Sequence, residues 1–264
     1  MEVIIRPNAE MAVELVSRLI ENQIKIKPDS VLGLATGRTM ERVYERLANG
    51  SSSFEHCTTF NLDEYVDLPP DNANSYQQYM RERFFSKINI NQANTHVPDG
   101  NAEDLNVAAL QYEQLIEQAG GIDTQLLGIG VAGHIGFNEP LSSIMSRTRA
   151  KSLTEQTREQ NAVMFGYNIN NVPKRAITMG VGTILDAREL ILLAIGNEKA
   201  AILAKAVEGP ITSMVSASAI QLHPNCKVIV DKAAAQALKG SDYYHFVFAN
   251  EPEWAPFRED TECS

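Results

Sequence analysis

Cysteine and long apolar runs are scarce in this sequence of 264 residues. The three cysteines, Cys57, Cys226 and Cys263, lie far apart without paired spacing, so we expect reduced thiols and a cytoplasmic location. No stretch approaches the length of a membrane span, which argues against a membrane protein. The N-terminus lacks the basic start and the long apolar run of a secretory signal, and its short apolar run predicts a first strand instead.

Positive charge is also limited, with 23 Lys and Arg residues against 33 Asp and Glu residues and a net charge of −10. No basic cluster is present, which argues against a nucleic-acid partner. The five histidines show no paired metal-ligand spacing and no nearby cysteine, so we expect no catalytic metal. An acidic protein that binds an anionic substrate must concentrate its few positive groups at the binding site.

Short apolar runs alternate with amphipathic segments along most of the chain. The runs predict strands at Val3–Ile5, Val31–Leu34, Thr58–Leu62, Gln125–Ile129, Ala176–Met179, Leu190–Ile195 and Lys227–Val230. The amphipathic segments predict helices at Ala9–Asn22, capped by Asn8, and at Asp104–Ala119 and Lys199–Val207. This order predicts an α/β fold: a doubly wound, three-layer α/β/α open sheet that is mostly parallel and Rossmann-like. We expect one domain over residues 1–249 and an acidic C-terminal tail over residues 250–264, either loose or packed on a neighbouring subunit.

Ligands of open α/β sheets bind beyond the carboxyl ends of the strands, and two loops expected there could bind phosphate. Thr36, Gly37, Arg38 and Thr39 precede a predicted helix and offer backbone N–H groups, hydroxyls and a guanidinium. Lys199 falls in the first turn of another helix, where a cation is unfavourable unless an anion is bound. Ordinary turn residues and a solvated lysine are the alternatives, because the first loop is neither a Walker loop nor a dinucleotide motif.

Two further loops carry candidate acid–base groups. Asp63 and Glu64 follow the strand at 58–62, and because side chains alternate along an extended segment, only one of them would face a substrate. The loop at 128–140 surrounds His134 with glycines and places Glu139 five residues later. Because a histidine accepts and donates protons near neutral pH, we interpret His134 as a functional group. The alternatives are a solvated loop or helix cap for the carboxylates and a structural role for the histidine.

Several motifs follow one another in a characteristic order. They are Phe60-Asn61-Leu62-Asp63-Glu64-Tyr65-Val66, Gly133-His134-Ile135 with Phe137-Asn138-Glu139-Pro140, Ser146-Arg147-Thr148-Arg149, Gly180-Val181-Gly182-Thr183 and Leu222-His223-Pro224. Together they resemble the glucosamine-6-phosphate deaminase family, and the likeness runs from about Val3 to Leu238. The related 6-phosphogluconolactonases share the fold and the Gly-His element but lack the Phe-Asn-Glu-Pro continuation, which disfavours a lactonase.

The resemblance implies an enzyme that converts glucosamine 6-phosphate and water to fructose 6-phosphate and ammonium without a cofactor. It implies that Asp63 moves a proton from C2 to C1 of the sugar. His134 would act on the ring oxygen to open the pyranose, with Glu139 as its partner. Galactosamine 6-phosphate is the alternative substrate.

Phosphate binding is the second role that the resemblance assigns, to Thr36, Gly37, Thr39 and Lys199. Three departures from the family bear on the site: Ala132 replaces a usual aspartate, Val163 replaces the usual phosphate arginine, and Arg38 replaces a usual glycine. We hypothesise that Arg38 supplies the guanidinium that position 163 no longer provides, the alternative being that Arg38 points to solvent. The changes at 132 and 163 also keep open a sugar-phosphate binding protein that has lost catalysis.

A last group of residues resembles a regulatory site. Ser142, Arg149 and Lys151 match positions at which allosteric family members bind N-acetylglucosamine 6-phosphate between subunits. The match implies an effector site and a homo-oligomer. The alternative is a charged surface turn and strand.

Overall fold

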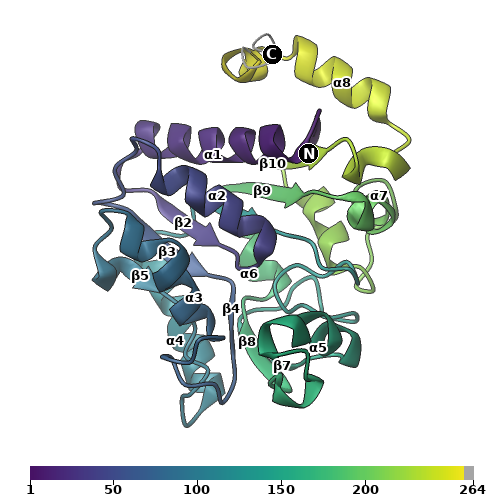
Figure 1. Ribbon diagram of the computed structural model, residues 1–264. Helices are drawn as coiled ribbons and strands as arrows, with labels where there is room; N and C mark the ends of the chain where they lie inside the picture. Colours follow the sequence, from purple (N-terminus) through teal and green to yellow (C-terminus); the bar gives the residue numbers. More distant parts are fainter. Residues whose placement is uncertain (259–264) are drawn as a thin grey trace.

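A computed structural model describes residues 1–258 of the chain, built around a seven-stranded parallel sheet (Figure 1). In spatial order the strands are β1 (Glu2–Arg6), β10 (Cys226–Asp231), β9 (Glu189–Ala194), β6 (Thr124–Leu127), β2 (Val31–Leu34), β3 (Thr58–Asn61) and β5 (Thr95–His96). Every pairing within this sheet is parallel. The predicted α/β class and mostly parallel sheet are therefore confirmed.

Helices cover both faces of the sheet, with α1 and α2 on one side and α4 and α6 on the other (Figure 1). Their bounds are α1 (Ala9–Ile26), α2 (Arg38–Ala48), α3 (Tyr76–Arg83), α4 (Leu105–Gln118), α5 (Glu155–Asn161), α6 (Val181–Leu185), α7 (Ala200–Val207) and α8 (Ser241–Asn250). Asn8 caps α1 as predicted, because its side chain accepts a hydrogen bond from the Met11 N–H. No helix in the described part of the chain is both long and apolar enough to cross a membrane.

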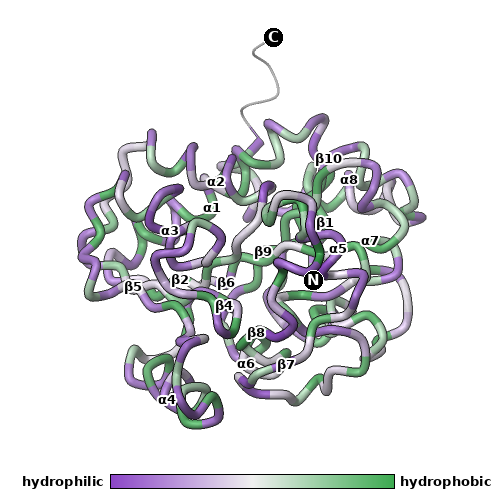
Figure 2. Tube along the Cα trace, turned by 60° about the horizontal axis from the view of Figure 1, so that its bottom comes forward, coloured by the Kyte–Doolittle hydropathy of each residue, from purple (hydrophilic) through white to green (hydrophobic). Residues whose placement is uncertain are grey.

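The apolar runs that predicted parallel strands lie at the centre of the core. Leu190, Ile191, Leu192 and Leu193 of β9 are all buried, as a strand covered on both faces requires. Figure 2 shows the neighbouring strands β1 and β10 as similarly hydrophobic. The carboxyl end of β9 holds one of the loops of the candidate site.

A second, three-stranded antiparallel sheet lies beside the main one, in the order β4 (Asp63–Tyr65), β8 (Arg175–Thr178) and β7 (Arg149–Ser152). The predicted strand at 58–62 ends at Asn61, and after Leu62 the chain enters β4 and pairs with β8. The predicted strand at 176–179 thus belongs to this small sheet and not to the parallel one. The bend is fixed at Leu62, whose N–H donates to Leu34 and whose carbonyl accepts from Met179.

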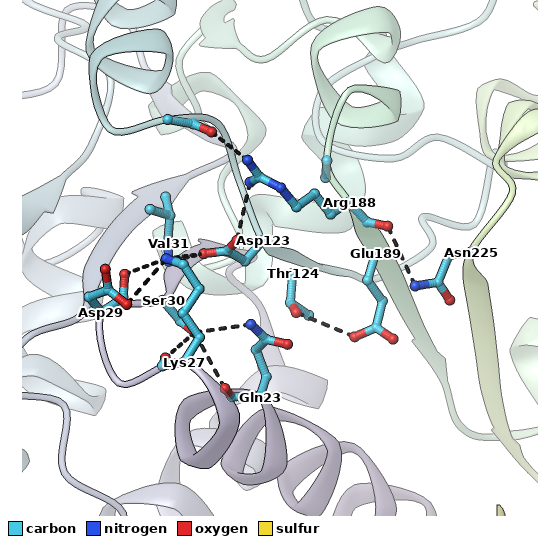
Figure 3. Close-up of polar contacts among 12 residues, drawn as sticks. Gln23, Lys27, Asp29, Ser30, Val31, Asp123, Thr124, Arg188, Glu189 and Asn225 are labelled. Atoms are coloured by element: carbon cyan, nitrogen blue, oxygen red, sulfur yellow. Dashed lines mark hydrogen bonds and ion pairs between the residues drawn. The ribbon is translucent and has the colours of Figure 1, made fainter. Parts of the chain in front are cut away.

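A buried carboxylate joins the amino ends of the central strands (Figure 3). Asp123, directly before β6, accepts hydrogen bonds from the Val31 N–H at 2.7 Å and from Lys27 Nζ at 2.9 Å. Its second oxygen accepts from Arg188 Nη1 at 3.1 Å. These contacts connect the end of α1 to β2, β6 and β9 at the sheet edge opposite the candidate site.

The segment after α8 packs on the first strand of its own chain. Trp254, in the turn Pro252–Phe257, is fully buried, and its Nε1 donates to Glu2 Oε1 at 3.3 Å. Its ring lies 5.7 Å from that of Phe248 and 6.0 Å from that of Phe257. Residues 250–258 of the expected tail are thus ordered against β1. Residues 259–264 of that tail, including Cys263, lie outside the described residues.

Candidate active site

A cavity of about 480 Å³ opens at the carboxyl ends of β2, β3, β6 and β9. All four loops singled out in the sequence contribute to its wall. Among the predicted site residues, the wall contains Thr36, Gly37, Arg38, Thr39, Asp63, His134 and Lys199. Glu139 is not part of the wall, because it lies behind His134. The topology therefore brings together groups that are up to 163 residues apart in the sequence (199 − 36).

The N-terminus of α2 forms one end of the cavity. The helix begins at Arg38, and Gly37 before it has a φ of 121°, a conformation that side-chain-bearing residues rarely adopt. The Tyr79 hydroxyl donates to the Gly37 carbonyl at 2.9 Å and fixes this turn. Thr36 and Thr39 flank it, so hydroxyls and the first-turn N–H groups of α2 face the same space, as an anion site requires.

The arginines of α2 form a stripe with a spacing of four residues, and its first two members, Arg38 and Arg42, line the cavity. Arg42 and Arg46 form ion pairs with Glu10 and Glu14 of α1, in the same order along both helices. The partner expected for Arg38 would lie four residues before Glu10, ahead of the start of α1 at Ala9. Arg38 instead lies exposed on the cavity wall.

Lys199 lines the same cavity and lies close enough to Arg38 for the two charges to interact. It is the residue immediately before α7, in the 3-10 turn Asn197–Lys199, and its Nζ donates to the Ile129 carbonyl at 2.9 Å. Burial lowers the pKa of Lys199, Glu198 opposes that effect, and the charge of Arg38 lowers the pKa further. Two cationic groups therefore share one end of the cavity, which suits a dianion.

Asp63 and Glu64 point in different directions, as the alternation predicted. Glu64 accepts hydrogen bonds from the N–H groups of Tyr76 and Gln77 at 2.9 Å and caps the start of α3. Asp63 faces the cavity, and burial raises its pKa to about 8, assisted by the charge of Glu64 and opposed by the Phe137 N–H. Such a group is protonated in the free protein at neutral pH and is strongly basic once ionised.

His134 lies on the cavity wall with Glu139 behind it. The His134 ring covers Gly130, where a Cβ would lie 2.1 Å from Nε2, so this ring position requires glycine. On the other side, Nδ1 lies 3.5 Å from Glu139 Oε2. Burial would raise the pKa of Glu139, but the nearby His134 imidazole, the Thr157 hydroxyl and the Thr154 N–H together lower it to about 2. An ionised Glu139 favours a proton on Nδ1 and leaves Nε2 on the cavity side.

Two of the three departures from the family pattern, Ala132 and Val163, remove a polar side chain. Ala132 is half-buried in the loop before His134 and offers no carboxylate. Val163 is 42% exposed and does not line the cavity. The same segment instead contributes Gln160, Asn161 and Met164 to the wall. None of these three was predicted, because the segment from α5 into the following 3-10 turn carries no recognisable motif.

Tyr76 is another wall residue that the sequence did not indicate. It is buried, and its ring stacks on that of Phe137 with centroids 6.0 Å apart. Tyr76 is the first residue of α3, and its position near Asp63 depends on Glu64 capping that helix. In the sequence, the only signal for Tyr76 is its position directly after Ser75, the N-cap of the helix.

The predicted effector residues lie outside the cavity. Ser142 is buried, Arg149 donates to Asn138 Oδ1 at 2.8 Å, and Lys151 lies on β7. Within residues 1–258, no group of three or more His, Cys, Asp or Glu side chains could hold a metal ion. Cys57 and Cys226 are buried free thiols, and burial raises the pKa of each.

Known proteins are similar to this chain in sequence and fold. The family described as glucosamine-6-phosphate isomerases/6-phosphogluconolactonase matches residues 7–229. A glucosamine-6-phosphate deaminase of Shewanella loihica is 51% identical over 251 residues, covering 94% of this chain and 93% of the relative. One of Arthrobacter sp. strain FB24 is 47% identical over 258 residues, covering 96% and 99%. The solved structure of a monomeric glucosamine-6-phosphate deaminase matches with a TM-score of 0.87 and 44% identity, covering 90% of this chain and 100% of that one.

The chain belongs to the glucosamine-6-phosphate deaminase family. A 6-phosphogluconolactonase from Leishmania guyanensis also matches, with a TM-score of 0.71 but only 18% identity, over 89% of this chain and 97% of that one. That likeness shows a shared fold alone.

Proposed function

We propose that this protein converts glucosamine 6-phosphate and water to fructose 6-phosphate and ammonium. The observation that carries the proposal is one cavity that combines a cationic end, a buried Asp63 and the imidazole of His134. The deaminase names of relatives that match almost the whole chain support the same activity. A role in amino-sugar metabolism follows from this reaction.

The cationic end would bind the substrate phosphate. Thr36, Gly37 and Thr39 would contribute the N-terminus of α2, and Arg38 and Lys199 the charge. The arginine stripe of α2 supports this role for Arg38, because Arg42 and Arg46 are paired with acids of α1 whereas Arg38 lies exposed on the cavity wall. Arg42 also lines the cavity, but it is held by Glu10. Arg38 of α2 would thereby replace the phosphate-binding arginine that the family usually has at position 163.

The catalytic steps would use the opposite end of the cavity. His134 Nε2 would take the proton of the C1 hydroxyl and give it to the ring oxygen as the C1–O5 bond breaks. Ionised Asp63 would then remove the proton from C2 and return it to C1 while one proton of the ammonium group passes to O1, which yields a hydroxyl at C1 and an iminium at C2. Addition of water and loss of ammonium complete the reaction. These steps balance with side chains and water alone.

Two alternatives for the chemistry differ in substrate or in outcome. Galactosamine 6-phosphate differs only in the configuration at C4, and the same groups could process it. A binding protein without catalysis is the second alternative, motivated by Ala132. A lactonase is disfavoured by the residues Asn138-Glu139-Pro140 after the histidine.

Assembly and regulation stay predictions. One similar solved structure is of a monomeric deaminase, so the comparison gives no support to the expected homo-oligomer. An effector phosphate at Ser142, Arg149 and Lys151 would act on Asn138, which Arg149 contacts next to Glu139 in the sequence. The cytoplasmic location also stays a prediction.

The test is ammonium release by the purified protein from glucosamine 6-phosphate and, separately, from galactosamine 6-phosphate. Asp63→Asn is the control, because it keeps the size of the side chain and removes the base. Release from glucosamine 6-phosphate that the variant abolishes supports the proposal. Release from the galactosamine substrate alone identifies the epimer, and binding of both without release supports the binding role.

A further inference from the structure

Thr154 contacts the carboxylate behind His134 although it does not line the cavity. It caps α5, where its Oγ1 accepts the Thr157 N–H at 3.2 Å. Its backbone N–H and its hydroxyl reach Glu139 Oε1 at 3.1 and 3.2 Å. The N-terminus of α5 therefore ends on a carboxylate that belongs to a different loop.

The two oxygens of Glu139 have separate partners. Oε1 accepts from Thr154, and Oε2 lies 3.5 Å from Nδ1 of His134. A buried carboxylate with a single loose contact could rotate or become protonated, and then it would no longer act on the imidazole. Donors on Oε1 hold the plane of the carboxylate and favour its charged form.

This arrangement matters more here because Ala132 provides no second acid beside His134. Within the described chain, Glu139 is the acidic side chain in ion-pair contact with that imidazole. The orientation of His134 therefore depends on whatever orients Glu139. In this structure that is the first turn of α5.

The other end of α5 reaches the cavity. Asn161, its last residue, lines the wall, and its Nδ2 donates to the Tyr65 hydroxyl at 2.8 Å. Tyr65 lies two residues after Asp63 on β4. One short helix thus spans from the partner of His134 to the strand that carries the candidate base.

We infer that Thr154 is a positioning residue that holds Glu139 Oε2 against His134 Nδ1 and thereby keeps Nε2 on the cavity side. This inference rests on the proposed function, in which Nε2 carries the proton between O1 and O5. Thr154 itself touches neither the cavity nor the reacting atoms. Its hydroxyl and N–H act through Glu139, as outer-shell partners of ligating histidines do.

Three exchanges separate this role from simple helix capping. Thr154→Asp keeps a good N-cap acceptor for α5 and the backbone N–H donor to Glu139, but replaces the hydroxyl donor with a like charge. Thr154→Ser keeps both the cap and the donor. Asn8→Asp adds the same charge at the cap of α1, remote from the cavity, and serves as the matched control.

Steady-state ammonium release and ¹⁵N NMR of the histidine side chains are then compared. We expect Thr154→Asp to lower kcat by about 10- to 100-fold, with KM within about 3-fold, in the range for outer-shell partners. We expect Thr154→Ser and Asn8→Asp to stay close to the unmodified protein. The Nδ1–H signal of His134, assigned through its loss in His134→Gln, should weaken or shift in Thr154→Asp only.

A Thr154→Asp variant with unchanged kcat and an unchanged His134 spectrum would overturn the inference. So would a loss of activity that leaves the spectrum unchanged, because that result points to capping or to substrate contact. The spectrum does not require turnover. If the unmodified protein releases no ammonium, the proposed function fails while the His134 spectra of the variants still decide the role of Thr154.

Discussion

Replacing Asp63 by asparagine should abolish activity and at the same time make the protein more stable. Burial raises the pKa of this carboxyl from 3.8 to about 8, and its neighbour Glu64 adds to the effect. A shift of about four pH units corresponds to a destabilisation on the order of 5 kcal/mol when the group is fully ionised, and solvent in the cavity makes this an upper bound. Asparagine has nearly the same shape and carries no charge.

The sign follows from the direction of the shift. Because the folded-state pKa of Asp63 lies above the unfolded value, its favourable contribution is fully present below pH 3.8 and is lost as the pH rises through 8. The difference in unfolding free energy between Asp63→Asn and the unmodified protein should therefore be small at pH 4 and grow toward pH 9. Urea unfolding at pH 5, 7 and 9 measures it directly.

Asp123→Asn is the matched control for this exchange. Asp123 is also buried, but it accepts hydrogen bonds from Val31, Lys27 and Arg188, so removing its charge should destabilise the protein. In the unmodified protein, kcat/KM should rise with pH toward about 8 as the Asp63 base ionises. An Asp63→Asn variant that is no more stable than the unmodified protein at pH 9 would refute the argument that the buried Asp63 carboxylate destabilises the folded protein.

Three other predictions concern separate parts of the molecule. Arg38→Ala should raise KM for the sugar phosphate by about 10- to 100-fold, the range for a hydrogen bond to a charged group. Arg46→Ala is the control and should leave KM unchanged, because Arg46 is paired with Glu14 of α1. An unchanged KM in Arg38→Ala would show that Arg38 only points to solvent. Ala132→Asp should raise kcat several-fold by giving His134 a second orienting carboxylate, and a lower kcat would mean that the loop has adapted to alanine. Burial and Glu253 raise the pKa of Glu2 to about 7, so the packing of Trp254 on β1 should be most stable below pH 4.5 and weaken as the pH rises through 7. Emission from Trp254, the single tryptophan, should shift to the red over that range, and an equal shift in Glu2→Gln would contradict this cause.

The parallel sheet could be predicted from the sequence because its strands are continuous apolar runs. The run in β9 has five consecutive buried residues, and this pattern is typical of a strand covered on both faces. The small antiparallel sheet could not be predicted in the same way. Its strand β4, Asp63–Tyr65, has only three residues, two of them acidic, and its partner β8 lies more than 100 residues further along the chain.

The candidate site was predictable to the extent that it lies at strand ends. Asp63, His134 and Lys199 follow β3, β6 and β9, whose carboxyl ends meet at one edge of the sheet, and that rule needs only strand positions. Tyr76 and Asn161 come from helices whose placement depends on contacts such as Glu64 with α3 and Asn161 with Tyr65. Contacts of this kind are tertiary, and no local pattern in the sequence encodes them.

The cavity holds its ionisable groups in states that a charged substrate would change. Burial shifts both Asp63 and Lys199 toward their neutral forms, although one is an acid and the other a base. A phosphate beside Lys199 would favour its charged form, and a substrate ammonium beside Asp63 would favour the carboxylate. Glu139 differs from both, because donors from the protein itself keep it ionised without a ligand. The substrate would therefore offset the cost of burying a charge at Lys199 and Asp63, the groups that bind or attack it. At Glu139, which only orients His134, hydrogen bonds within the fold offset that cost. On this argument a sugar phosphate that lacks the amine should bind at the cationic end but leave Asp63 protonated near neutral pH.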